Sequence, residues 1–186
     1  MRASDDPSGA WAAWRHGRDE LFRHHPQSPI PPADRGSFTR LNYFDYNPEA
    51  RVLATVEEVE DQSTMVLEAS EGTMELLRFG RAAFELLGQP MTLDLFWFQT
   101  YGGGLFLSFR DLTSGKLTYG GCRYLLDTVK GADLGTKDGK LVLDFNFSYQ
   151  PSCAYDPRWV CPLAPPSNRL PVEVLAGEKL RNEGMM

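Results

Sequence analysis

The sequence predicts a mainly β protein, an antiparallel β-barrel or sandwich of about eight or nine strands with an N-terminal amphipathic helix. From residue 50 onward, short segments alternate between apolar and polar residues, as half-buried strands do. Turn residues such as Gly102-Gly103-Gly104 separate them, and no helical segments lie between them as in a parallel α/β sheet. The expected strands are 51–59, 63–69, 73–79, 81–87, 91–99, 104–111, 117–127, 140–149 and 170–176.

Residues 10–24 form the predicted helix, in which Trp11, Trp14, Leu21 and Phe22 share one stripe and which Pro26 ends. We interpret it as a lid helix that docks its two tryptophans on the β domain; a helix that binds a partner protein is the alternative. The expected organisation is a helix and tail over 1–27, a single β domain over 28–179 and a disordered tail over 180–186.

The composition excludes several classes of protein. A net charge of -6 argues against a nucleic-acid or anionic-membrane partner, because phosphate groups are bound by clustered Lys and Arg. The sequence contains neither a membrane-spanning apolar run nor the apolar stretch of a signal peptide, so we expect a cytoplasmic protein. A small-molecule ligand and a second copy of the chain remain open as partners, and no cofactor is expected.

A polar cluster is expected where strands 104–111, 117–127 and 140–149 meet. Alternation along 140–149 puts Leu141, Leu143, Phe145, Phe147 and Tyr149 on a core face, and Val142, Asp144, Asn146 and Ser148 on the other. Short polar residues of poor β propensity there fit the wall of a pocket. Arg123 falls among apolar neighbours and needs a carboxylate, for which Asp111 and Asp144 are the candidates.

Three interpretations of this cluster remain open. The first is a site for a small polar or anionic ligand, with the cluster converging beneath the proline-rich loop 150–168. The second is a hydrolase-like enzyme, with Asp144 or Asp111 as general base and Arg123 or Tyr119 stabilising negative charge. The third is a structural Arg–carboxylate clamp in a protein-interaction module. The predicted ligand-binding residues are Arg110, Tyr119, Arg123, Asp144, Asn146 and Tyr149.

The histidines and cysteines do not predict a metal site or a catalytic triad. All three histidines lie in the first 25 residues, away from any nucleophile in the strands. Cys153 and Cys161 lack the close spacing of a zinc knuckle, although Cys122 and a distant histidine could complete a four-ligand site. We expect thiols that pack in the interior; a Cys153–Cys161 disulfide would require an oxidising compartment.

Several segments carry a family resemblance. They are Ser28-Pro29, 41–44, 109–115, 118–125, 144–155, 161–170 and 176–179, of which the last three are the most specific. With these segments the chain resembles the bacterial and archaeal family catalogued as domain of unknown function 1684, over nearly all of the chain after the helix. Cys122 stands where the family pattern has a small residue. The resemblance implies no activity, because none is established for the family.

Overall fold

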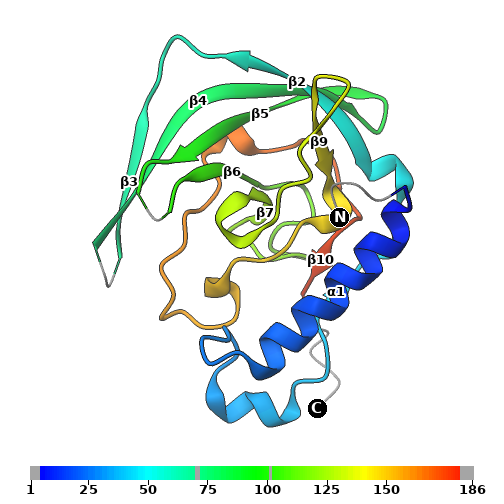
Figure 1. Ribbon diagram of the computed structural model, residues 1–186, viewed down its shortest axis with the longest axis vertical. Coiled ribbons are helices and arrows are strands. Elements are labelled where there is room, and N and C mark those ends of the chain that lie inside the picture. The colour runs from blue at the N-terminus through cyan, green and yellow to red at the C-terminus, as the bar shows by residue number, and fades with distance from the viewer. Residues whose placement is uncertain (1–4, 70–71, 101, 181–186) are drawn as a thin grey trace.

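An antiparallel sheet curled into a half-barrel is the centre of the structure, and one α-helix lies across its open side (Figure 1). The computed structural model describes residues 5–69, 72–100 and 102–180. Within these residues the protein is mainly β, as predicted. The strands are β1 Asn42–Tyr43, β2 Arg51–Glu58, β3 Thr64–Ala69, β4 Gly72–Leu86, β5 Gln89–Phe98, β6 Gly104–Phe109, β7 Arg123–Asp127, β8 Thr136–Lys137, β9 Lys140–Asp144 and β10 Glu178–Lys179.

Eight of these strands form the half-barrel, in the order β7-β6-β5-β4-β2-β9-β8, with β3 on β4; β1 and β10 pair separately. The predicted strands 73–79 and 81–87 are one strand, β4, which bends at an irregularity between Arg78 and Gly80. A Cβ on Gly80 would lie 3.1 Å from the carbonyl oxygen of Glu57, so glycine lets β2 approach closely at the bend. The long bent strand allows β2, β3 and β5 to pair along one curved surface.

The segment 170–176 was predicted as a strand, and this prediction is wrong. It is extended but belongs to no described strand, and its backbone bonds are single links such as Leu112 N–H to the Val172 carbonyl. Its alternation has another cause: Leu170, Val172, Val174 and Ala176 are buried in the main core with side chains from β4, β5, β6 and β9. The segment therefore fills the half-barrel without extending its sheet.

Two further strands are shorter than predicted. The strand expected over 140–149 ends at Asp144, whose side chain accepts a hydrogen bond from the Asn146 N–H and caps the 3-10 helix Phe145–Phe147. The strand expected over 117–127 begins only at Arg123. The predicted face of Val142, Asp144, Asn146 and Ser148 on one strand is thus wrong, because the chain coils after the second of these residues.

The N-terminal helix α1 spans Pro7–His24, begins three residues before its predicted start and docks on the β domain as expected. Asp6 caps it by accepting a hydrogen bond from the Gly9 N–H. Trp11 and Phe22 are buried in a cluster that includes Tyr43 and Phe147. Among the described residues, no helix is long and apolar enough to cross a membrane. The predicted disordered tail lies outside the described residues, except Leu180, whose N–H donates to the Leu117 carbonyl.

Candidate functional site: a cavity beneath helix α1

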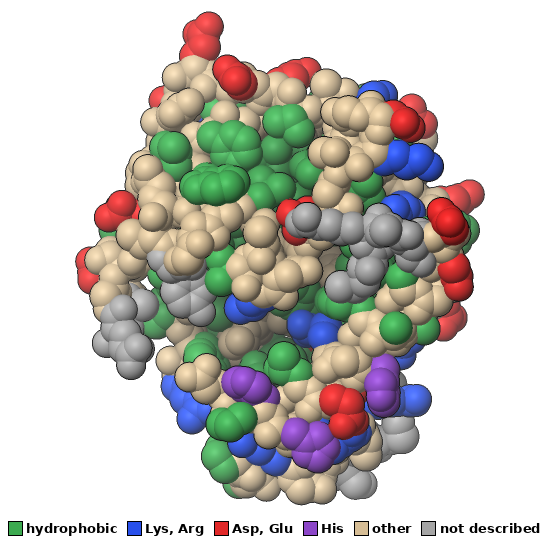
Figure 2. Space-filling model, in the orientation of Figure 1, with side chains coloured by type: hydrophobic (Ala, Val, Ile, Leu, Met, Phe, Trp, Pro, Cys, Tyr) green, Lys and Arg blue, Asp and Glu red, His purple; other side chains and the backbone are tan. Residues whose placement is uncertain are grey.

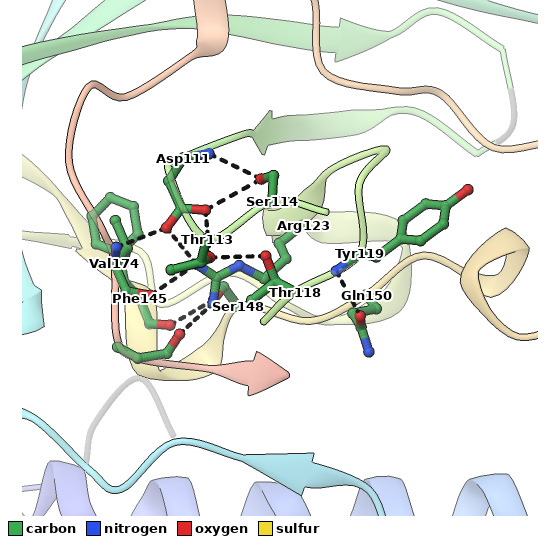
Figure 3. Close-up of polar contacts among 11 residues, drawn as sticks. Asp111, Thr113, Ser114, Thr118, Tyr119, Arg123, Phe145, Ser148, Gln150 and Val174 are labelled. Carbon is green, nitrogen blue, oxygen red and sulfur yellow. Dashed lines mark hydrogen bonds and ion pairs between the residues drawn. The ribbon is translucent and has the colours of Figure 1, made fainter. Parts of the chain in front are cut away.

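Arg123 and Asp111 form a fully buried ion pair at the end of the half-barrel (Figure 3). The guanidinium lies 3.2 Å from the carboxylate and also donates to the backbone carbonyls of Val174 and Ala176. Asp111 in turn accepts from the Val174 N–H at 2.7 Å and from the Thr113 hydroxyl at 2.7 Å. Burial lowers the pKa of Arg123 to about 10 against the opposing effect of Asp111, so the side chain stays charged at neutral pH. The pair holds segment 170–176 in the half-barrel.

Asp144 and Asn146 belong to a second buried cluster. Asp144 lies 3.0 Å from the Arg51 guanidinium, and its other oxygen accepts from the backbone and side-chain amides of Asn146. Asn146 also exchanges two hydrogen bonds with the Asn47 backbone, and its carbonyl accepts from the Trp11 indole. Burial raises the pKa of Asp144, although Asn146 and Arg51 counteract it. These groups satisfy one another and connect α1 to the end of the sheet.

A cavity of about 370 Å³ lies between α1, the sheet and the proline-rich loop. Figure 2 shows a hollow on this face, with Lys and Arg side chains inside it and hydrophobic side chains along its walls. The apolar lining is Trp14, Leu21, Phe22, Pro29, Met74, Phe98, Tyr124, Ala132, Tyr149, Trp159, Val160 and Pro162. The polar or reactive lining is Arg18, His25, Gln27, Asp127, Lys130, Gln150, Ser152 and Cys161.

Arg18 lines this cavity and reaches from α1 to Glu178 on β10. It lies 2.9 Å from the buried carboxylate of Glu178 and 3.0 Å from the Tyr43 hydroxyl, and it stacks 4.4 Å from the centre of the Tyr149 ring. Burial alone would lower the pKa of Arg18, but Tyr43 and Glu178 outweigh it and raise the pKa. Burial raises the pKa of Glu178, and Arg18 opposes this. The contact fastens the lid helix to the strand β10.

Asp127, at the end of β7, organises the other side of the cavity. Its carboxylate accepts from the Tyr149 hydroxyl at 2.9 Å, and its other oxygen accepts from the Lys130 backbone N–H. The Lys130 ammonium lies 3.8 Å from this carboxylate, and its side chain is 43% exposed. Burial and Asp127 raise the pKa of Tyr149 well above its usual value, so its hydroxyl stays protonated as a donor. The lysine charge is therefore placed at the cavity with only a loose partner.

The model of the family described as Protein of unknown function (DUF1684) matches residues 36–179. The chain belongs to this family. The solution NMR structure of an uncharacterised protein from the archaeon Haloarcula marismortui is similar to this DUF1684 protein, with 39% identity and a TM-score of 0.70. The match covers 94% of this chain and 95% of the archaeal one. No curated protein matches the sequence.

The DUF1684 structure separates the residues that were expected to form one ligand site. Tyr149 lines the cavity, whereas Arg123 belongs to the first buried cluster and Asp144 and Asn146 to the second. Arg110 is half-buried and bridged by its backbone to Arg169. The Tyr119 N–H donates to the Gln150 side chain (Figure 3). The expectation that Arg123 pairs with a carboxylate is confirmed for Asp111; the catalytic roles of Asp111, Asp144 and Tyr119 stay predictions.

Several cavity residues were missed from the sequence. Arg18 follows Trp14 by four residues and precedes Phe22 by four, so it lies on the apolar stripe of the helix, and this position was a usable signal. No local sequence pattern marked the cavity residues Asp127 and Lys130, or Glu178, the partner of Arg18. Across the described residues, no three His, Cys, Asp or Glu side chains are grouped so as to hold a metal ion.

A second, more open hollow of about 390 Å³ lies on another part of the surface. Its polar lining includes Arg78 and Arg81, each of which places its Nε 2.9 Å from a carboxylate oxygen of Asp94. Because one buried carboxylate already engages both guanidinium groups, this hollow is the weaker candidate for an anionic ligand.

Proposed function

We propose that this DUF1684 protein binds a small molecule with a mostly apolar body and one anionic group in the cavity beneath α1. The observation that carries the proposal is the cavity itself. Its volume of about 370 Å³ falls in the range of small-molecule sites, and a largely apolar lining with a few polar groups is typical of them. The hydrolase interpretation receives no comparable support, because neither Asp111 nor Asp144 lines this cavity.

Lys130 is the group best placed to bind the anionic end of the ligand. An ammonium group has three donors, and the Lys130 ammonium lies 3.8 Å from the Asp127 carboxylate, beyond a normal hydrogen bond. Arg18 is less available, because Glu178 and Tyr43 already engage its guanidinium. An entering carboxylate or sulfonate would thus meet the Lys130 ammonium, which Asp127 engages only loosely.

Aromatic side chains supply the binding surface for the apolar body. Trp14 packs against Tyr149 with ring centres 6.2 Å apart, and Tyr124 packs edge-on against Tyr149 at 5.6 Å. Their rings belong to α1, β7 and the start of the proline-rich loop, and the adjoining Phe98 comes from β5. Flat hydrophobic walls of this kind favour a ligand with an aromatic or otherwise rigid apolar body.

The test uses anilinonaphthalene sulfonate, which combines an aromatic body with one sulfonate. The native protein should bind it in the cavity, with quenching of tryptophan fluorescence from Trp14 and Trp159. Lys130→Gln should weaken binding about tenfold, the effect of losing one charge-assisted hydrogen bond. Ala132→Phe, which fills the cavity and keeps the lysine, should abolish saturable binding. Lys137→Gln, on the exposed strand β8, is the matched control. Unchanged binding by both cavity variants would refute the proposal.

A further inference from the structure

We propose that Cys153 and Cys161 form a redox-active dithiol that exchanges with small-molecule disulfides, with Cys161 as the attacking thiolate and Cys153 as the resolving thiol. This activity goes beyond the proposed binding function and does not depend on a ligand in the cavity. The dithiol and the cavity adjoin each other, because Cys161 also lines the cavity.

The two cysteines are in contact across the proline-rich loop. Both are free thiols and half-buried, and the Cys153 backbone N–H donates to the Cys161 sulfur at 3.4 Å. Cys153 is held by the 3-10 helix Ser152–Ala154, and Pro162 directly follows Cys161, so the backbone holds both thiols in place. Exchange requires this proximity, because the second thiol must reach the first sulfur.

The surroundings of the two sulfurs differ and assign their roles. The hydrogen bond from the Cys153 thiol lowers the pKa of Cys161, and the Cys153 N–H and the charge of Lys130 act in the same direction. The same thiol–thiol hydrogen bond, together with burial, raises the pKa of Cys153. A thiolate is the nucleophile in exchange, so Cys161 attacks first and Cys153 second.

Access to the pair is also asymmetric. Cys161 lines the cavity with Lys130 and Trp159, so a small disulfide can reach its sulfur from the hollow. The lysine would attract the carboxylates of a peptide disulfide such as oxidised glutathione. The third cysteine, Cys122, is completely buried, and burial raises its pKa to about 12. It is therefore suited to packing and provides an internal control.

The reaction balances without another redox partner. The Cys161 thiolate attacks one sulfur of oxidised glutathione and the disulfide bond breaks. The first glutathione leaves as a thiolate and takes up the proton that Cys161 had released. Cys153 then loses its proton and attacks the Cys161 sulfur, and the second glutathione leaves and takes up that proton. Two electrons pass from the dithiol to the small disulfide, which gives one protein disulfide and two small thiols.

The test treats the reduced native protein with oxidised glutathione, quenches by alkylation and assigns each cysteine by mass spectrometry. The unmutated chain should form a 153–161 disulfide and release two equivalents of glutathione. Cys153→Ser should accumulate glutathione on Cys161, because the resolving thiol is absent. Cys161→Ser should react at least about tenfold more slowly, since the low-pKa thiol is lost. Cys122→Ala should behave as the unmutated protein.

A second measurement uses only the unmutated chain, so it tests the proposal even if the cysteine variants fold poorly. Brief alkylation with iodoacetamide near neutral pH should label Cys161 before Cys153 and Cys122, and the preference should vanish in urea. The proposal is overturned if glutathione first attaches to Cys153 or Cys122, or if a mixed disulfide persists in the unmutated chain. Equal labelling of the three thiols in the native protein would also overturn it.

Discussion

The guanidinium of Arg123 lies 3.2 Å from the carboxylate of Asp111, and neither side chain has appreciable contact with solvent. The same guanidinium donates to the carbonyls of Val174 and Ala176, two residues apart on the extended segment that fills the half-barrel. Asp111 accepts a hydrogen bond from the Val174 N–H. One ion pair therefore takes the place of ladder hydrogen bonds that this segment would make as a strand, and it does so at the C-terminal end of the segment.

Arg123→Ala should destabilise the protein by about 3–5 kcal/mol, because it leaves Asp111 as a buried charge without its guanidinium. The free energy of unfolding in urea measures this. Arg158→Ala is the matched control: the Arg158 side chain is 52% exposed in its pair with Asp156, and loss of this pair should cost less than about 1 kcal/mol. Equal stability of the two variants would show that the buried pair has no structural role.

Arg18→Met should also destabilise the protein by about 3–5 kcal/mol near neutral pH, because Glu178 would then lie buried without a cation. The loss should shrink in acid. A carboxyl whose folded pKa is raised carries its full penalty above that pKa. The penalty shrinks as the pH falls through the folded pKa and is gone below the unfolded pKa, where the group is neutral in both states. The pKa of Glu178 is already raised by burial, and loss of the opposing arginine would raise it further.

Urea unfolding of this variant at neutral pH and near the usual glutamate pKa of 4.5 measures the effect. The variant should recover stability relative to the unmutated chain at the lower pH. In the double variant Arg18→Met with Glu178→Gln, no carboxyl remains at position 178 to titrate, so this recovery should be absent. A recovery of equal size in the double variant would assign it to other groups.

The limits of the sequence interpretation are clearest at Asp144. Strict alternation from Leu141 onward predicted a strand to Tyr149, yet the strand ends where an aspartate side chain can cap the next turn. The poor β propensity of Asp, Asn and Ser in this segment predicted the wall of a pocket. It is better explained by local hydrogen bonds between these side chains and the backbone, which compete with a sheet ladder.

The cavity could not be predicted for a different reason. Its walls come from α1, from β4 and β5, and from the proline-rich loop, segments that only the tertiary fold brings together. Sequence patterns report which residues share an element, and they correctly placed Trp14 on the face of the helix that packs against the β domain. They do not report the distance between Arg18 and Glu178, which are 160 positions apart.

Asp94 should contribute an acid-sensitive part of the stability. Burial alone would raise its pKa, but hydrogen bonds from Arg78 and Arg81 outweigh burial and lower it. A depressed carboxyl pKa stabilises the fold above the unfolded value of 3.8, and this contribution is lost as the pH falls through the folded value. Asp94→Asn should therefore lower the free energy of unfolding more near neutral pH than near about pH 2. Glu85→Gln, on the exposed side of β4, should show no such difference.

Asn168 joins β5 to β6 at the point where the two strands stop pairing. Their register pairs Phe96 with Phe106, so Asp94 and Ser108 would be opposite each other two residues further on. In their place, the Asn168 side chain accepts from the Asp94 N–H at 2.7 Å and donates to the Asp94 and Ser108 carbonyls at 2.9 and 2.8 Å. The amide thus bridges the gap and anchors the end of the proline-rich loop.

Asn168→Ala would deprive three buried backbone groups of their partners, and we expect a loss of about 3 kcal/mol or more. Asn168→Asp should be worse, because a carboxylate oxygen would face two carbonyls. Urea unfolding gives the size of the loss, and hydrogen exchange locates it: the Asp94 amide should exchange faster in the alanine variant. Gln89→Ala, with an exposed side chain on β5, is the control. If the Asp94 backbone amide is equally protected in Asn168→Ala and in the Gln89→Ala control, another group must accept its hydrogen bond and the bridging role is wrong.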